Sequence, residues 1–220
     1  MVDEPASKSA ITGSSAEPAV FVVPLSTPPH VSDGAVLRPL LSASTIQTRV
    51  QELAAQIRAD LGPDEITLLC ILKGAFVFAS DLARALTGPV HVEFLGVASY
   101  GDGMHSTGAV RITHDLARPI EGQQVVVVED IIDTGLTLHY LLRELSARQP
   151  KSLHVAALLE KPAGKSPVHA DYTGFRIHGE FVVGYGLDWA QRFRNLPYIA
   201  AVDLAHAPTL LELPHVAPGR

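Results

Sequence analysis

The sequence contains a single cysteine, Cys70, among its 220 residues. One cysteine cannot form an intramolecular disulfide or a multi-cysteine zinc site, so both are excluded. Cys70 stands within the apolar run from Ile66 to Leu72, and this position indicates a small core residue.

Basic residues are outnumbered, with 17 Lys and Arg against 23 Asp and Glu and a formal net charge of -6. This balance argues against a surface built to hold a nucleic-acid backbone, so any polyanionic ligand must meet a local basic site. Hydrophobic residues make up 47% and charged residues 18% of the chain, which excludes a disordered polymer. The length is enough to bury a sizeable core.

Long hydrophobic runs are also lacking. No apolar stretch reaches the roughly 18 residues that cross a bilayer, because Lys73, Glu129 and Asp130 interrupt the longest runs. The N-terminus carries Asp3 and Glu4 and lacks the basic and then apolar order of a secretory signal. These observations predict a cytoplasmic protein.

Proline, serine, threonine and alanine dominate the start of the chain, without a sustained helical or strand period. We expect a flexible N-terminal tail over residues 1–35, one folded domain over 36–205, and a C-terminal tail over 206–220.

Helical and strand patterns alternate through the folded domain. The first predicted helix has apolar positions at helical spacing from Ile46 to Leu61, and Ser44 with Gln47 forms a possible capping box at its start. Alternation of this kind predicts an α/β fold with a parallel sheet flanked by helices. The other predicted elements are helices at Ala75–Leu86 and Leu138–Ala147, and strands at Ile66–Leu72, Val90–Val97, Ala109–Thr113, Val125–Val128 and Leu153–Leu159.

A long glycine-containing segment, from Ser99 to Gly108, separates two of these strands. Loops of this length inside a compact domain usually have a function, often as a cover for an active site. We therefore expect this segment to act as a lid.

The strongest chemical signal is VVVVEDIIDTGLT, residues 125 to 137. A buried strand ends in Glu129 and Asp130, and the chain then turns through Asp133 to Thr137 into a helix. Backbone N–H groups at a helix start, with threonine hydroxyls, can hold a phosphate. The acidic pair suits the hydroxyls of a sugar or a hard cation. A phosphorylated ribose with magnesium satisfies both requirements.

Simpler interpretations explain less. Asp133 and Thr134 could merely cap a helix, but two acidic residues directly after four valines need a further reason. The sequence has no G-x-x-x-x-G-K-[ST] motif and no third glycine of a dinucleotide fingerprint. His91 and Glu93 match half of a zinc deaminase motif whose cysteine half is absent.

The segment resembles the phosphoribosyl-diphosphate motif of the type I phosphoribosyltransferases, and its EDIIDTG core is similar to the 6-oxopurine branch, the hypoxanthine-guanine phosphoribosyltransferases. The resemblance spans roughly residues 36 to 205. The other matching motifs are Leu72–Lys73–Gly74, Ser99–Tyr100, Lys161, and FVVGYGLDWAQRFR at 181 to 194. The resemblance implies the family's parallel sheet with helices on its faces and a small hood formed by terminal segments.

The resemblance implies a magnesium-dependent transfer of phosphoribose to a purine, giving IMP and GMP with release of pyrophosphate. Asp133 would be the catalytic base. Lys161, Phe181, Val182 and Asp188 would contact the purine, and Glu129, Asp130 and Asp188 are the implied metal ligands. The implied phosphoribosyl-diphosphate site comprises Lys73, Gly74, Ser99, Tyr100, Glu129, Asp130, Asp133, Thr134, Gly135, Thr137 and Arg194.

Relatives often carry a basic residue after the glycine of this motif, where this chain has Leu136. The resemblance also implies a homodimer or homotetramer, with small-molecule substrates and neither nucleic acid nor membrane as a partner. A xanthine-guanine or pyrimidine phosphoribosyltransferase remains an alternative, as does a nucleotide-sensing regulatory protein on the same fold.

Overall fold

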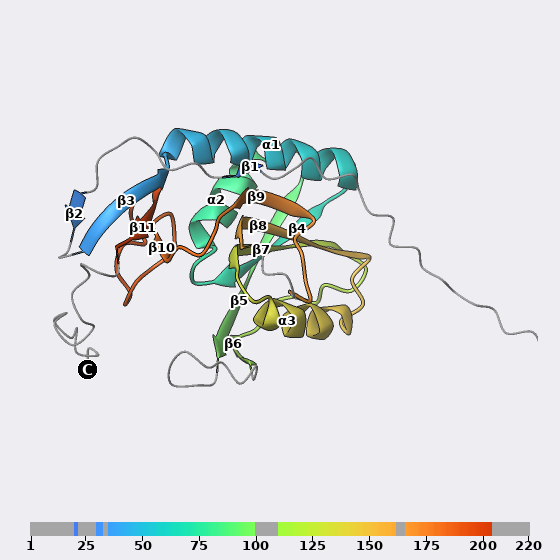
Figure 1. Ribbon diagram of the computed structural model, residues 1–220. Helices are drawn as coiled ribbons and strands as arrows, with labels where there is room; N and C mark the ends of the chain where they lie inside the picture. The colour runs from blue at the N-terminus through green and yellow to red at the C-terminus, as the bar shows by residue number, and fades with distance from the viewer. Residues whose placement is uncertain (1–19, 22–29, 33–34, 100–109, 162–165, 204–220) are drawn as a thin grey trace, which may run out of the picture.

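The computed structural model describes residues 20–21, 30–32, 35–99, 110–161 and 166–203 (Figure 1). The main sheet has seven strands in the order β1-β9-β8-β7-β4-β5-β6, and all neighbouring pairs are parallel except β5 with β6. The α/β prediction with a mainly parallel sheet is confirmed. The strands are β1 (Val20–Phe21), β4 (Ile66–Leu72), β5 (Val90–Ser99), β6 (Val110–His114), β7 (Gln124–Ile132), β8 (Ser152–Glu160) and β9 (Tyr172–Arg176).

Three helices cover this sheet on two faces. Helices α1 (Ala43–Leu61) and α2 (Phe76–Ala85) share one apolar cluster, and α3 (Leu136–Ser146) belongs to the other. Figure 1 shows α1 above the sheet and α3 below it. Strand β4 and the Val125–Val128 part of β7 are buried and almost wholly apolar, as expected for strands buried on both faces.

A second, four-stranded sheet forms the hood, in the order β10-β11-β3-β2. It joins N-terminal strands to C-terminal strands through antiparallel pairs. A hood formed by segments from both ends of the domain was predicted, and it is confirmed. Its strands are β2 (His30–Ser32), β3 (Ala35–Leu41), β10 (Val182–Val183) and β11 (Ile199–Val202).

Two short strands lie within the segment expected to be a tail. Val20–Phe21 pairs with β9, and His30–Ser32 pairs with β3. Strands of two or three residues are too short to produce a periodic sequence pattern, and sheet edges supply their hydrogen-bond partners. The rest of residues 1–35, apart from Ala35 at the start of β3, lies outside the described residues, as does the predicted C-terminal tail.

The predicted capping box on the first helix is wrong. The helix begins at Ala43, and the hydroxyl of Ser42, two residues earlier than expected, accepts from the backbone N–H of Thr45 at 3.1 Å. The apolar stripe was placed correctly, because Ile46, Val50 and Leu53 are buried.

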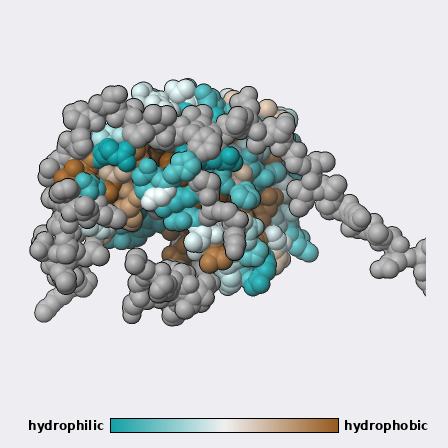
Figure 2. Space-filling model, in the orientation of Figure 1, coloured by the Kyte–Doolittle hydropathy of each residue, from teal (hydrophilic) through white to brown (hydrophobic). Residues whose placement is uncertain are grey.

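On the face seen in Figure 2, the surface over the hood and the surface over α1 differ in hydropathy. Hydrophobic residues gather over the hood sheet, while the surface over α1 is mostly hydrophilic. Among the helices that the structure describes, none is long and apolar enough to cross a membrane.

Candidate active site

The candidate residues gather where the central parallel strands end. Strands β7 and β8 are in register up to Ile132 and Glu160, so the segments that follow them leave the sheet side by side. In open α/β sheets, ligands bind at this carboxyl edge.

Glu129 and Asp130 lie near the end of β7 and are partly buried. Burial, with the neighbouring charge of Asp130, raises the pKa of Glu129 well above its ordinary value. Burial also raises the pKa of Asp130, to about 6, although two backbone hydrogen bonds and the Arg194 guanidinium oppose the shift. One oxygen of Glu129, Oε2, is buried without a hydrogen-bond partner. Such a carboxylate is suited to a ligand that supplies hydroxyl groups or a cation.

Asp130 is packed against the turn that follows β4. A Cβ placed on Gly74 would lie 1.4 Å from Oδ2 of Asp130, so only glycine fits. On the other side, a Cβ on Gly186 would lie 2.1 Å from the carbonyl oxygen of Gly74. Gly186 has a φ of 102°, which also favours glycine. The predicted Lys73–Gly74 turn, the acidic pair and the Gly186 turn therefore meet at one place.

Arg194 and Asp188 are joined at the same place. The Arg194 guanidinium contacts Asp188 Oδ1 at 2.8 Å and donates to the carbonyl of Gly186 at 2.8 Å. Asp188 also accepts from the backbone N–H of Gln191. These contacts fix a cation beside the buried acids, in a position suited to an anionic ligand.

Asp133 and Lys161 face each other across the ends of β7 and β8. The Lys161 ammonium donates to Asp133 Oδ2 at 3.0 Å. The backbone N–H of Lys161 donates to the carbonyl of Ile132 at 2.9 Å, which holds the two segments together. The Asp133 side chain is 60% exposed, so a ligand can reach its carboxylate.

The predicted phosphate turn lies between Asp133 and α3. Gly135 has a φ of 71° and precedes the helix, and its carbonyl accepts from the N–H of His139 at 2.8 Å. The Thr134 hydroxyl accepts from the N–H of Leu136 at 3.5 Å. Leu136 itself is 48% exposed and adds no charge here, while Thr137 stands in the first turn of α3.

The hood carries the remaining purine candidates. Phe181 is 41% exposed, as a ring that stacks on a ligand must be, whereas Val182 is buried in β10. The Phe181 carbonyl accepts from Val202, so this part of the hood is tied into its sheet.

Ser99 is the last residue of β5, and Tyr100 lies outside the described residues. The predicted lid, Ser99 to Gly108, therefore stays a prediction.

Sequence reasoning missed Tyr185, whose buried hydroxyl donates to Asp81 of α2. Burial and this hydrogen bond raise the pKa of Tyr185 above its ordinary value. The contact fastens the Gly186 turn to α2. Tyr185 stands inside the FVVGYGLDWAQRFR motif, so the motif marked the segment without indicating this role.

The residues present fit a magnesium ion only in part. Glu129 and Asp130 offer the carboxylate oxygens that this ion prefers, and Glu129 Oε2 has no other partner. Asp188, the third predicted ligand, is engaged by Arg194. Across the described ranges, no three His, Cys, Asp or Glu side chains cluster as a ready cation site. This arrangement suits an ion held mainly by substrate oxygens and water.

Comparisons with known proteins agree with this arrangement. Residues 40–189 match the phosphoribosyl transferase domain model. The hypoxanthine-guanine phosphoribosyltransferase of Mycobacterium avium is 46% identical, over 80% of this chain and 90% of its own length. The Bacillus subtilis protein of the same name is 42% identical, over 76% of this chain and 93% of its own.

Solved structures show the same relationship. The crystal structure of a hypoxanthine-guanine phosphoribosyltransferase from Bacillus anthracis superposes with a TM-score of 0.71 at 45% identity, covering 74% of this chain and 97% of that one. The chain belongs to the phosphoribosyl transferase domain family, within its hypoxanthine-guanine phosphoribosyltransferase branch.

Proposed function

We propose that the chain transfers the 5-phosphoribosyl group from phosphoribosyl diphosphate to hypoxanthine and guanine, releasing pyrophosphate and giving IMP and GMP. A purine ring nitrogen displaces pyrophosphate at C1 of the ribose, through a transition state with oxocarbenium character. The enzyme has to remove a proton from the base and hold the leaving group.

Asp133 accepts the proton that the attacking ring nitrogen loses. Its carboxylate is exposed and already accepts a hydrogen bond from Lys161 at 3.0 Å. When a purine enters, the Lys161 ammonium is free to donate to the 6-oxygen of the base, which a 6-amino group cannot accept. Phe181 stacks on the purine, and Val182 supplies backbone hydrogen bonds to its edge.

The sugar and phosphates are held at the ends of β4 and β7. Glu129 and Asp130 hold the ribose hydroxyls, while the turn from Asp133 to Thr137 holds the 5-phosphate. Arg194 and the Lys73–Gly74 backbone hold pyrophosphate oxygens, with Ser99 and Tyr100 as further contacts. Glu129, Asp130 and Asp188 are the residues that would hold a magnesium ion together with the substrate, and the ion would supply positive charge to the leaving pyrophosphate.

The observation that carries the proposal is the 3.0 Å contact between Lys161 and Asp133, directly beside the phosphate turn. This contact brings a hydrogen-bond donor for the 6-oxygen of a purine and a proton acceptor together at the ends of β7 and β8. A spectrophotometric assay with phosphoribosyl diphosphate and magnesium tests the proposal on hypoxanthine, guanine, xanthine, adenine and uracil. Turnover of hypoxanthine and guanine without adenine supports it, and preference for uracil or adenine contradicts it.

A cytoplasmic homodimer or homotetramer stays a prediction. Phe76 of α2 and Phe94 of β5 are exposed by 43% and 42%, and exposed rings of this size are candidate subunit contacts. Light scattering on the purified protein gives the subunit number.

A further inference from the structure

Tyr185 lies in the turn that follows β10, between two glycines. All three residues have a positive φ, which is 97° at Gly184, 51° at Tyr185 and 102° at Gly186. This left-handed region is unfavourable for a residue with a Cβ, so a side chain kept there is expected to make a contact that offsets the cost. Tyr185 is 6% exposed, and its hydroxyl donates to Oδ2 of Asp81 in α2.

Asp81 is connected through α2 to the Lys73–Gly74 turn. The helix follows this turn directly, and the backbone N–H of Phe76 donates to the carbonyl of Lys73 at 3.3 Å. Asp81 stands midway along α2, and its Oδ1 is paired with Arg84. A helix moves as a unit with the turn from which it starts, so a contact at Asp81 also acts on the Lys73–Gly74 turn.

On the other side, the Tyr185 turn is bonded to the Arg194 segment. The backbone N–H of Tyr185 donates to the carbonyl of Leu196 at 2.8 Å, and that of Gly186 donates to the carbonyl of Arg194 at 3.0 Å. The Arg194 guanidinium returns a hydrogen bond to the Gly186 carbonyl at 2.8 Å. These three bonds hold the Arg194 guanidinium against the turn that carries Tyr185.

The two turns touch at two points. At the first, Gly186 meets Gly74 backbone to backbone, since a Cβ on Gly186 would lie 2.1 Å from the Gly74 carbonyl oxygen. A single close contact leaves the turns free to rotate about it. The hydrogen bond from Tyr185 to Asp81 is directional and supplies the second point. Together the two contacts fix how the Arg194 guanidinium lies relative to the Gly74 turn.

We propose that Tyr185 and Asp81, through this hydrogen bond, are positioning residues for the pyrophosphate group of phosphoribosyl diphosphate. The inference rests on the proposed function, in which Arg194 and the Lys73–Gly74 backbone hold pyrophosphate oxygens. Neither Tyr185 nor Asp81 touches the substrate. Their hydrogen bond sets the spacing of two groups that must bind the same anion, and a spacing set before binding reduces the cost of ordering those groups.

The test uses steady-state kinetics of variants of the full-length enzyme. Tyr185→Phe removes the hydroxyl and keeps the ring. Asp81 is then still paired with Arg84, and its side chain is 29% exposed, so no buried charge is left without a partner. Asp81→Asn retains a side-chain oxygen that can accept from Tyr185, whereas Asp81→Ala removes the acceptor. Arg84→Ala controls for loss of the ion pair with Asp81.

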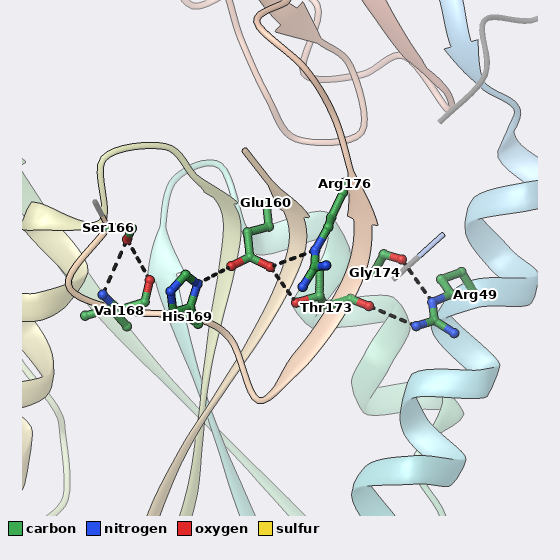
Figure 3. Close-up of polar contacts among 8 residues, drawn as sticks. All are labelled: Arg49, Glu160, Ser166, Val168, His169, Thr173, Gly174 and Arg176. Carbon is green, nitrogen blue, oxygen red and sulfur yellow. Dashed lines mark hydrogen bonds and ion pairs between the residues drawn. The ribbon is translucent and has the colours of Figure 1, made fainter. Parts of the chain in front are cut away.

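Tyr172, in a strand that carries none of the candidate site residues, offers a matched control. It is 3% exposed, and burial and then Asp60 of α1, to which its hydroxyl donates, raise the pKa of Tyr172 above its ordinary value. The next two residues of β9 are held independently, because the carbonyls of Thr173 and Gly174 accept from Arg49 at 2.9 Å and 3.0 Å (Figure 3). Tyr172→Phe therefore removes the same kind of hydrogen bond away from the candidate active site.

We expect Tyr185→Phe to raise two constants about fivefold each, somewhat less than for a lost charged contact to the substrate itself. These are the KM for phosphoribosyl diphosphate and the inhibition constant of inorganic pyrophosphate. The KM for hypoxanthine should change by less than about twofold, because Lys161 is held by Ile132 and Asp133 rather than by either turn.

The other variants test whether the hydrogen bond carries the effect. Asp81→Ala should match Tyr185→Phe, and the double variant should be no worse than either, because both remove one interaction. Asp81→Asn should recover most of the affinity. Arg84→Ala and Tyr172→Phe should leave both pyrophosphate constants unchanged, although Tyr172→Phe lowers the melting temperature.

The outcomes that overturn the inference are distinguishable from failure of the proposed function. If Arg194→Ala raises the two pyrophosphate constants and Tyr185→Phe does not, the pyrophosphate site stands and the positioning role is wrong. If Tyr172→Phe raises them as much as Tyr185→Phe, or if Tyr185→Phe raises the hypoxanthine KM equally, the effect is only structural. Unchanged constants in Arg194→Ala remove the pyrophosphate assignment and the inference together.

Discussion

The ends of β7 and β8 lie side by side, and each has a glutamate with buried carboxylate oxygen, but the two glutamates differ in whether those oxygens have hydrogen-bond partners. Glu129 at the end of β7 has a buried oxygen without a partner, and burial raises its pKa. Glu160 at the end of β8 is satisfied by His169, Thr173 and Arg176. A buried polar group without a partner costs free energy and is retained where a ligand completes it, while a satisfied one stabilises the fold around it. The comparison separates the ligand-binding end from the supporting end.

The largest effect is expected at the exposed acid that follows β7. Asp133→Asn should lower kcat by about 100-fold, the usual range for losing a proton acceptor, with little change in phosphoribosyl diphosphate binding. Asp115→Asn is the matched control, because Asp115 is similarly exposed, at 56% against 60%, and also forms an ion pair. Single-turnover rates measure the chemical step. Wild-type turnover in Asp133→Asn would mean that another group accepts the proton.

Beyond the end of β8, we expect loss of base affinity rather than of chemistry. Lys161→Ala should raise the KM for hypoxanthine about tenfold, as expected when a charged hydrogen bond is lost. It should also reduce the preference for hypoxanthine over adenine. Lys151→Ala, which breaks an ion pair with Asp64 at 3.3 Å, controls for loss of a lysine charge. Kinetics with hypoxanthine and adenine side by side give the answer, and an unchanged preference would contradict the assignment.

Stability offers a direct contrast between the two strand ends. Glu160→Gln should lower the free energy of unfolding by about 1–3 kcal/mol, because the new amide cannot satisfy three donors. Glu129→Gln should raise it by about 1 kcal/mol or more in protein free of metal and substrate, because a buried unpaired charge is removed. Urea unfolding of both variants measures this. Equal destabilisation in both would erase the distinction drawn between the two ends.

The sequence was enough to predict the β7 end and the position of Lys161 after β8, but not the part that Glu160 plays. Continuous apolar runs marked the central strands, and VVVVEDIIDTGLT placed its acids at their ends, because local sequence determines both. Glu160 follows the predicted strand Leu153–Leu159 and carried no signal of its own, since its partners belong to a different strand and loop, and tertiary pairing leaves no local pattern. At the start of α1 the local pattern pointed to the wrong serine: Ser42 caps the helix, although Ser44 with Gln47 matched the capping-box pattern.

The smallest effect concerns pH. Burial raises the pKa of Asp130 to about 6, above its ordinary value of 3.8, so the folded protein binds this proton more tightly than the unfolded chain. Stability from this group therefore falls as pH rises through that interval, and between about pH 7.5 and about pH 5 the metal-free protein should gain about 1 kcal/mol from it. The variant Asp130→Asn should lose this part of the pH dependence, so the difference between the wild-type and variant curves isolates the contribution of Asp130. Chemical unfolding with a chelator present gives both curves. Parallel curves would show that Asp130 is better solvated than its position between Gly74 and Arg194 implies, and the contrast with Glu160 would then rest on Glu129 alone.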